Sequence, residues 1–404
     1  MLYEQTILLL EMLFRKFDQP ISKTPLSFCM ENIIQSVITS FLVSFISIPV
    51  VITVASSKKL FDLPGNRKLH DQPIPHLGGV VFFASVLLSC TLFTSFVSNP
   101  ELQFFIAASV IIFFFGIKDD LVSISPFKKF TGQLIAAFIL VYLGKFQINS
   151  LYGFLGYGTM NSFWSIVFTV VTVLLIINAY NLIDGINGLA ASLGILSCSI
   201  FGVYFYLAND ITYAVLSFSM VASLVAFIYY NKTPAKIFMG DAGSLFLGLV
   251  NAALVIKFIK IPNLTSFGIS QSAFIGLSFI FIPVVDALRL FTARIFMGRS
   301  PFSSDTNHIH HLLLRFGLSH LKVTGIIIIL SSLIIGLSFF VQSFGINLAV
   351  FSIFGVGFLI PYLLIKLSPK SLEDLTDNDL EIGKVKSITT TVISIDSESR
   401  VINN

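Results

Sequence analysis

The stretch FFFGIKDDLVSISPFKK, residues 113–129, runs from an apolar segment directly into two adjacent carboxylates, Asp119 and Asp120. Neighbouring carboxylates repel each other, and one of them tends to take up a proton unless a cation lies between them. The pair is therefore consistent with a bound metal ion, a protonated acid or a well-solvated loop. Which of these applies depends on what the rest of the chain brings near the pair.

The composition is that of a polytopic membrane protein. Of the 404 residues, 55% are hydrophobic and 11% are charged, and the mean hydropathy is +0.89. Soluble domains carry about 25% charged residues, so long apolar runs with less than half of that charge indicate a chain embedded in a bilayer. The three cysteines, Cys29, Cys90 and Cys198, lack the close spacing of a disulfide framework or a zinc site.

Eleven apolar segments approach the roughly 20 residues that a transmembrane helix needs. They lie near residues 33–55, 79–98, 102–117, 130–145, 163–179, 187–208, 212–230, 244–259, 270–290, 323–343 and 347–367. We therefore expect an all-α polytopic fold with three parts. These are an N-terminal interfacial segment over residues 1–32, a transmembrane domain over 33–368 and a polar C-terminal tail over 369–404.

The basic residues are unevenly distributed between the two sides of this arrangement. With eleven spans, one side holds 19 of the 25 Lys and Arg residues. Because such residues concentrate in cytoplasmic loops, we expect the N-terminus outside and the C-terminus in the cytoplasm. The motifs rich in Asp, Asn, His and Gly fall on the same side, so any active site is expected on the cytoplasmic face.

This orientation places Asp119 and Asp120 at the C-terminal end of a helix. That end carries partial negative charge, which disfavours carboxylates. Lys118, Lys128 and Lys129 flank the pair. A metal ion or a phosphate nearby explains all five charges, whereas a solvated loop does not explain the unfavourable position.

The segment NAYNLIDGINGLA, residues 178–190, repeats a polar residue at every third position: Asn178, Asn181, Asp184 and Asn187. Oxygens at that spacing can converge on one cation or contact a polar ring, and the glycines between them let backbone approach a ligand. A membrane re-entry turn is the alternative, since Asn, Asp and Gly are ordinary turn residues. Six such residues exceed what a turn needs, which favours a functional site.

The segment NKTPAKIFMGDAGSLFLG, residues 231–248, places Asp241 and Ser244 at the start of the following helix. Both are good helix N-caps. The same helix start is also an anion site, because its free N–H groups point toward the cytoplasm. A carboxylate beside such a site is typical of a divalent ion held together with a phosphate.

The longest internal cytoplasmic loop, residues 294–320, contains the sequence HIHH and four of the six histidines. His308 and His311 lie one helical turn apart and could bind zinc, but no carboxylate or thiol follows at a usual distance. The arginines, Arg299 among them, suit a diphosphate ligand. The first cytoplasmic loop adds Lys68 and His70, for which a substrate contact and an ordinary basic loop are equally good explanations.

Acids for a divalent metal, bases for phosphates and amides for a polar ring, all at one membrane face, indicate phosphoryl transfer from a soluble nucleotide to a lipid. Catalysis of such reactions consists mainly of positioning and charge neutralisation, with a metal ion bridging the diphosphate oxygens. A divalent cation would also make the two adjacent carboxylates mutually favourable.

The motifs FGIKDDL, NAYNLIDGINGLA, FMGDAGSLFLG and HIHH, in this order, resemble those of the polyprenyl-phosphate N-acetylhexosamine-1-phosphate transferase superfamily, glycosyltransferase family 4. They most resemble the bacterial branch that attaches GlcNAc-1-phosphate to undecaprenyl phosphate, and the resemblance covers about residues 45–320. It implies a multi-pass enzyme of the bacterial inner membrane that uses Mg²⁺ or Mn²⁺ and UDP-GlcNAc. The implied products are UMP and undecaprenyl-diphospho-GlcNAc, which starts a lipid-linked cell-envelope glycan such as O-antigen.

The resemblance also implies roles for individual residues. Asp119 corresponds to the aspartate that deprotonates or orients the lipid phosphate, and Asp120 lies beside it. Asp241 corresponds to the principal metal ligand, with Asp120 and Asp184 as further metal and catalytic groups. Asn187 replaces a carboxylate of many bacterial members and is interpreted as a uracil contact. The remaining implied substrate contacts are Lys129, Asn181, Asn231, Arg299, His308, His310 and His311.

Two alternatives come from other readings of the same motifs. The sister enzyme that transfers phospho-MurNAc-pentapeptide usually has three consecutive histidines and GDVGS or GDTGS, so HIHH and GDAGS argue against it. A secondary transporter would place polar residues near mid-bilayer, usually with internal repeats, whereas here they lie at span ends. The sequence leaves open the N-acetylhexosamine, the polyprenyl length, the glycan pathway and whether the chain forms a homodimer. We expect no nucleic-acid partner.

Overall fold

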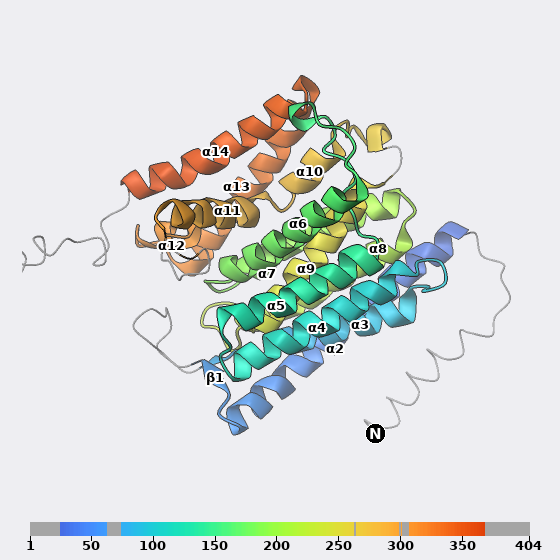
Figure 1. Ribbon diagram of the computed structural model, residues 1–404. Coiled ribbons are helices and arrows are strands. Elements are labelled where there is room, and N and C mark those ends of the chain that lie inside the picture. The colour runs from blue at the N-terminus through green and yellow to red at the C-terminus, as the bar shows by residue number, and fades with distance from the viewer. Residues whose placement is uncertain (1–24, 63–73, 262–263, 299, 301–306, 368–404) are drawn as a thin grey trace, which may run out of the picture.

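The computed structural model describes residues 25–62, 74–261, 264–298, 300 and 307–367. Within these residues, long helices run roughly side by side in one bundle (Figure 1). The described residues also form a small sheet of two antiparallel strands with two residues each, β1 (Phe61–Asp62) and β2 (Ile74–Pro75). Of the predicted features, most of the N-terminal interfacial segment, the C-terminal tail, Lys68, His70 and Arg299 lie outside the described residues.

Each predicted apolar segment is matched by helical structure. In chain order the helices are α2 (Pro25–Ser57), α3 (Gly78–Phe93), α4 (Glu101–Leu121), α5 (Pro126–Phe138), the π-helix η2 (Ile139–Leu143), the 3₁₀-helix η3 (Phe154–Gly156), α6 (Ser162–Ile183), α7 (Leu189–Leu207), α8 (Ile211–Asn231), α9 (Gly240–Ile259), η4 (Leu264–Phe267), α10 (Ser272–Ser278), α11 (Phe281–Phe296), α12 (Ile309–Leu314), α13 (His320–Val341), η5 (Gln342–Phe344) and α14 (Ile346–Leu367).

The described helices that pass a length and hydropathy criterion for crossing a membrane are fewer than the eleven predicted spans. Among the described residues, eight helices are long and apolar enough to cross a membrane: α2, α4, α6, α7, α8, α9, α13 and α14. A ninth span requires α10 and α11 together, and these are bent by 84° at a break. Helix α3 has only 16 residues, and α5 changes into a π-helix. The structure therefore confirms an all-α multi-pass membrane protein but not the predicted span count.

Helix α9 forms the centre of the bundle. Its apolar window is 94% buried within the protein, and it packs against α3, α4, α6, α7 and α10. Close approach is possible because glycines face it: an added Cβ at Gly79 would lie 2.2 Å from the Gly243 nitrogen, and one at Gly116 would lie 2.4 Å from the Ala242 Cα. Small residues at such contacts let membrane helices pack backbone to backbone.

A hydroxyl cluster joins α2, α3 and α8 inside the bundle. Ser44 Oγ lies 2.6 Å from Ser223 Oγ, Ser85 donates to Ser223 at 3.0 Å, and Ser40 donates to the Ser219 carbonyl at 2.7 Å. Hydrogen bonds of this kind satisfy polar groups between membrane helices. They hold the N-terminal helix to the core without any charged residue.

The polar ends of the helices meet at one end of the bundle. There the C-terminal ends of α4, α6 and α8 contact the N-terminal ends of α5, α7 and α9. This alternation follows from successive helices running in opposite directions. It brings together residues as far as 122 positions apart in the chain, and these include the acidic and amide motifs identified in the sequence.

The packing of α4 on α9 predicts that Gly116 cannot accept even one methyl group. We expect Gly116→Ala to destabilise the protein by about 1–3 kcal/mol, since overpacking displaces backbone. The measurement is the thermal unfolding midpoint of the purified protein in detergent. Gly336→Ala in α13 is the matched control, because nothing lies within 4 Å of the added Cβ. Equal midpoints for the two variants would contradict this packing.

Candidate active site

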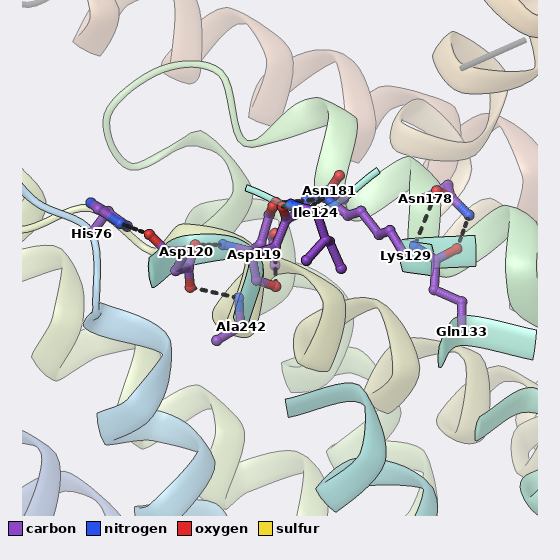
Figure 2. A network of polar contacts seen from close by, with 11 residues as sticks. His76, Asp119, Asp120, Ile124, Lys129, Gln133, Asn178, Asn181 and Ala242 are labelled. Atoms are coloured by element: carbon purple, nitrogen blue, oxygen red, sulfur yellow. Dashed lines mark hydrogen bonds and ion pairs between the residues drawn. The ribbon is translucent and has the colours of Figure 1, made fainter. Parts of the chain in front are cut away.

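Asp241, the second residue of α9, lies at the centre of the polar cluster. Its Oδ2 accepts a hydrogen bond from Lys129 Nζ at 2.7 Å, and its Oδ1 accepts one from Asn181 Nδ2 at 2.5 Å. Asn181 Nδ2 also donates to Ser244 Oγ at 2.8 Å. Three helices, α5, α6 and α9, thus converge on one carboxylate, and Figure 2 shows Lys129 and Asn181 in the surrounding polar network.

Lys129 lies between the carboxylates of Asp119 and Asp241. Its Nζ lies 3.1 Å from Asp119 Oδ2 as well as 2.7 Å from Asp241 Oδ2. Burial lowers the pKa of Lys129, but the two carboxylates outweigh this effect and raise its pKa above the ordinary value, so the ammonium stays charged. Asp119 also accepts from the Ile124 backbone N–H at 2.9 Å. The protein itself therefore supplies a cation, the Lys129 ammonium, between Asp119 and Asp241.

Asp120 turns away from its neighbour and binds the start of α9 (Figure 2). Its two carboxylate oxygens accept from the N–H groups of Asp241 at 2.6 Å and Ala242 at 3.0 Å, where a helix N-terminus favours negative charge. The backbone carbonyl of Asp120 accepts from His76 Nε2. Gly240 has a φ of 72°, and a Cβ there would collide with the His76 carbonyl.

The contacts of Asp120 are with protein backbone, and its role as a metal ligand stays a prediction. The sequence placed it at the metal–diphosphate centre, but both of its carboxylate oxygens already bind backbone N–H groups of α9. Its contact is with a helix that begins 120 positions later in the chain. The role that the structure gives Asp120 is to fix Asp241 in position.

Asp184 follows the last residue of α6 and precedes the glycine-rich turn. It has no side-chain hydrogen bond to another described residue. Burial and the negative charge of Asp241 raise the pKa of Asp184 to about 7. A partly buried carboxylate close to a second one, without a hydrogen-bond donor of its own, marks a position where a cation would be stabilised.

The donor set fits a magnesium ion that takes only part of its ligands from the protein. No three Asp, Glu, His or Cys side chains converge as a preformed metal site within the described ranges. Mg²⁺ is usually bound by one or two carboxylates together with substrate phosphates and water, rather than by an all-protein cage. Asp241 and Asp184, with the amide oxygen of Asn181, supply donors suited to that arrangement.

A cavity of about 230 Å³ opens beside the cluster, between α5, α6 and α11. Its lining includes the charged residues Asp119, Lys129 and Arg294 and the apolar residues Phe130, Leu182 and Phe291. The cavity also borders a reciprocal amide pair, in which Asn178 donates to Gln133 at 2.7 Å. Such a lining matches a ligand with an anionic head and an apolar chain.

A larger cavity, of about 550 Å³, lies at the opposite end of the bundle. It is lined by hydroxyl and amide side chains of helix ends and by Lys257 and Lys260. None of the residues selected from the sequence borders it. Position relative to the acidic motifs, rather than volume, therefore identifies the smaller cavity as the candidate site.

The HIHH segment, residues 308–311 and called the histidine turn below, packs against the glycine-rich turn, residues 184–188. His310 is fully buried, and a Cβ added to Gly185 would lie 2.2 Å from its Nε2. Burial, reinforced by the neighbouring His311, lowers the pKa of His310 well below its ordinary value. His310 packs against Gly185, and its contact with substrate stays a prediction, while His308 Nδ1 lies 2.8 Å from Asp286 Oδ2. The HIHH and DGING motifs thus form one wall at the same end of the bundle.

Two predicted substrate contacts have mainly protein partners. Asn231 is buried, and its side chain accepts from the Gly188 N–H at 2.6 Å and donates to the Ile237 carbonyl at 2.7 Å. Asn187 donates to Thr233 Oγ1 at 3.2 Å. Asn231 therefore ties the glycine-rich turn to the segment before α9, and contact with phosphate stays a prediction for it, as contact with uracil does for Asn187.

The sequence analysis missed Asp286 and counted Arg294 with the basic loop that suits a diphosphate rather than with the apolar segment. Both lie in α11, where they are buried at 2% and 3% exposure. Charged side chains inside an apolar segment are costly and usually functional, and this signal was available in FIPVVDALRLFTARIF. The predicted site residues came from loop motifs, whereas the apolar composition of α11 is that of an ordinary membrane span.

Comparison with known proteins establishes the class. Residues 102–259 match the model of glycosyl transferase family 4. The chain is 34% identical over 328 residues to a probable undecaprenyl-phosphate N-acetylglucosaminyl 1-phosphate transferase of Bacillus subtilis, covering 80% of this chain and 89% of the relative. The chain therefore belongs to glycosyl transferase family 4.

Further relatives have related names. A decaprenyl-phosphate N-acetylglucosaminephosphotransferase of Mycobacterium leprae is 31% identical over 71% of this chain and 78% of its own length. An undecaprenyl-phosphate alpha-N-acetylglucosaminyl 1-phosphate transferase of Escherichia coli is 29% identical over 65% of this chain and 71% of its own length. The resemblance predicted from the motifs is confirmed.

The position of Asp120 predicts a loss of stability that does not involve metal. Asp120→Ala leaves two N–H groups of α9 without an acceptor, which should cost about 1–3 kcal/mol. The measurement is the thermal unfolding midpoint in excess EDTA. Asp120→Asn is the matched control, because it retains an acceptor oxygen and should lose less. A wild-type midpoint for Asp120→Ala in EDTA would show that the residue acts mainly as a metal ligand.

Proposed function

We propose that the protein transfers N-acetylglucosamine-1-phosphate from UDP-GlcNAc to undecaprenyl phosphate, giving UMP and undecaprenyl-diphospho-GlcNAc. The names of the B. subtilis and E. coli relatives support the substrates. The observation that carries the proposal is the Asp119–Lys129–Asp241 cluster beside a cavity lined by both charged and apolar side chains. Few other reactions need a phosphate site that is continuous with a lipid site.

The proposed acceptor site is the cavity between α5, α6 and α11. Lys129 and Arg294 place positive charge in its lining, which offsets the charge of a phosphate head group. Phe130, Leu182 and Phe291 provide surface for the first isoprene units. Asp119 belongs to the same lining, 3.1 Å from Lys129, so it is placed to orient the acceptor phosphate and to hold a proton from it.

The proposed donor site lies where α6, α9 and the histidine turn meet. When bound, Mg²⁺ supplies charge neutralisation of the diphosphate, and Asp241 and Asp184 would hold it. Asn181 fixes the orientation of the Asp241 carboxylate through its amide. Lys129 contributes a second positive charge between the donor and acceptor sites.

The proposed reaction is a direct displacement. An oxygen of the acceptor phosphate attacks the β-phosphorus of UDP-GlcNAc and forms a new P–O bond. The bond from that phosphorus to the bridging oxygen breaks, and UMP leaves with the electron pair. The bond between the sugar and its phosphate stays intact. The residues of the site bring two anions together and neutralise their charge, which is the main requirement of phosphoryl transfer.

The proposed orientation places this site at the cytoplasmic face of the bacterial inner membrane. The distribution of basic residues supports it, as does the need for a nucleotide sugar from the cytoplasm. The product would start a lipid-linked envelope glycan. The transporter alternative is not favoured, because the polar motifs gather at one end of the bundle and the relatives are named as transferases.

The proposal predicts donor-specific release of UMP. Purified protein in detergent with undecaprenyl phosphate and Mg²⁺ should release UMP from UDP-GlcNAc, and excess EDTA should abolish the release. Asp241→Asn should lower the rate by at least 10³-fold, because the carboxylate of the donor site is lost. Asp210→Asn, at the opposite end of the bundle, is the control and should keep wild-type activity.

UMP released only from UDP-MurNAc-pentapeptide would refute the sugar assignment. Release from no nucleotide sugar by folded protein would refute the proposed function.

A second prediction concerns the acceptor. Arg294→Met should raise the KM for undecaprenyl phosphate at least tenfold while changing the KM for UDP-GlcNAc less than threefold, since Arg294 borders only the lipid-side cavity. Initial rates of UMP release with each substrate varied in turn give both constants. Lys128→Met removes an exposed positive charge next to Lys129 and should change neither. Equal effects of Arg294→Met on both constants would refute the acceptor site.

A further inference from the structure

We infer that Asp286 is a positioning residue that orients His308 toward the donor substrate. The inference rests on the proposed function, because it assigns part of the donor site. Asp286 lies in α11 within the apolar sequence FIPVVDALRLF and is 2% exposed. A buried carboxylate without hydrogen-bond partners would be strongly destabilising. The partners of Asp286 therefore indicate its role.

The carboxylate of Asp286 binds three donors around the histidine turn. Oδ2 lies 2.8 Å from His308 Nδ1, and Oδ1 accepts from the Ile309 backbone N–H at 3.1 Å and from Arg289 Nη2 at 3.0 Å. Two of the three donors belong to consecutive residues at the start of α12. Helix α11 therefore fixes both the backbone and the ring of His308.

Arg289 strengthens this attachment from the same helix. Its Nη2 also donates to the Asn307 carbonyl at 2.5 Å, and Arg315 Nη2 donates to the Asn307 side-chain oxygen at 3.0 Å. The turn at residues 307–309 is thus held at its backbone, its amide and its imidazole. Such a network specifies one orientation of the His308 ring rather than merely anchoring a loop.

The contact with Asp286 decides which ring nitrogen is left for a ligand. A carboxylate accepts hydrogen bonds, so Nδ1 carries the hydrogen that points to Asp286, and Nε2 is the ring atom that remains for substrate. Carboxylates that bind one nitrogen of a functional imidazole commonly fix its tautomer and direction in this way.

The histidine turn is held against the donor site by a second contact. The His308 and His310 rings lie nearly parallel, with centroids 5.6 Å apart and planes at 15°. His310 packs on Gly185, the residue after Asp184. His308 is therefore linked through one ring to the turn that carries a proposed Mg²⁺ ligand, which places it on the donor side of the site.

Helix α11 also joins the two halves of the site. Asp286 and Arg289 hold the histidine turn, and Phe291 and Arg294, one to two turns further along, border the acceptor cavity. One helix after a sharp bend thus carries groups for both substrates. The position of α11 sets the distance between them.

Asp286→Asn is the test variant. The amide keeps the size of the carboxylate and one acceptor oxygen for Ile309 and Arg289, but presents N–H groups to His308 Nδ1. The ring must then accept at Nδ1 and carry its hydrogen on Nε2. We expect kcat/KM for UDP-GlcNAc to fall at least tenfold, with the KM for undecaprenyl phosphate changed less than twofold. The same substitution at Asp210 is the control for loss of an acid.

A double-mutant cycle separates positioning from a merely structural role. In a His308→Ala background, Asp286→Asn should cost less than a further twofold in kcat/KM for UDP-GlcNAc, because the group on which it acts is gone. A full tenfold further loss would overturn the inference, and so would wild-type kinetics for Asp286→Asn alone.

A measurement on the unsubstituted chain keeps the inference testable if Asp286→Asn does not fold. In ¹⁵N spectra of histidine-labelled protein, His308, assigned by comparison with His308→Gln, should carry its hydrogen on Nδ1. A neutral ring with the hydrogen on Nε2 alone would overturn the inference. These outcomes are separate from failure of the proposed function, which would appear as absence of UMP release by wild-type protein from any nucleotide sugar.

Discussion

The ammonium of Lys129, held between the carboxylates of Asp119 and Asp241, is the interaction on which the site depends. It joins the ends of α4, α5 and α9 at distances of 3.1 and 2.7 Å. A cation between two acids from distant parts of the chain offsets the repulsion of their negative charges. The same charge lies where two anionic substrates would meet, so the group that stabilises the resting site also suits the reaction.

The position of α9 makes this interaction possible. Its N-terminus is bound by the Asp120 carboxylate, and its first turns contact the glycines of α3 and α4 at backbone distance. Larger side chains in place of these glycines would displace the start of α9 and move Asp241 away from Lys129 and Asn181. The small residues at the start of α9 are therefore as important to the chemistry as the charged ones, because they set where the charges lie.

Much of the fold and part of the site could be predicted from the sequence. Apolar segments located the long helices, since burial in lipid demands long apolar runs, and alternation of direction predicted that Asp119, Asp184 and Asp241 would share one end. The bend between α10 and α11 was not predicted, because mean hydropathy does not change at it. The predicted count of eleven spans is not confirmed for the same reason: hydropathy does not show where a helix is short or bent.

The partner of a given polar side chain was harder to predict than its place. Asp120 was assigned to a metal because it adjoins Asp119, yet its partners are N–H groups 121 and 122 positions away. Asp286 was overlooked because one acid in an apolar span forms no motif. Its partner, His308, becomes adjacent only when the loop after α11 folds back. Side-chain direction and long-range pairing are set by packing, which the sequence pattern does not show.

Anomalous diffraction from Mn²⁺, in crystals grown with UDP-GlcNAc, tests the central claim most directly, that α6 and α9 hold a cation with the donor diphosphate. The account predicts a single strong peak bonded to the carboxylates of Asp241 and Asp184 and to diphosphate oxygens, with Asp120 still bound to the start of α9. A peak on the histidine turn, or one bonded to Asp120, would contradict it.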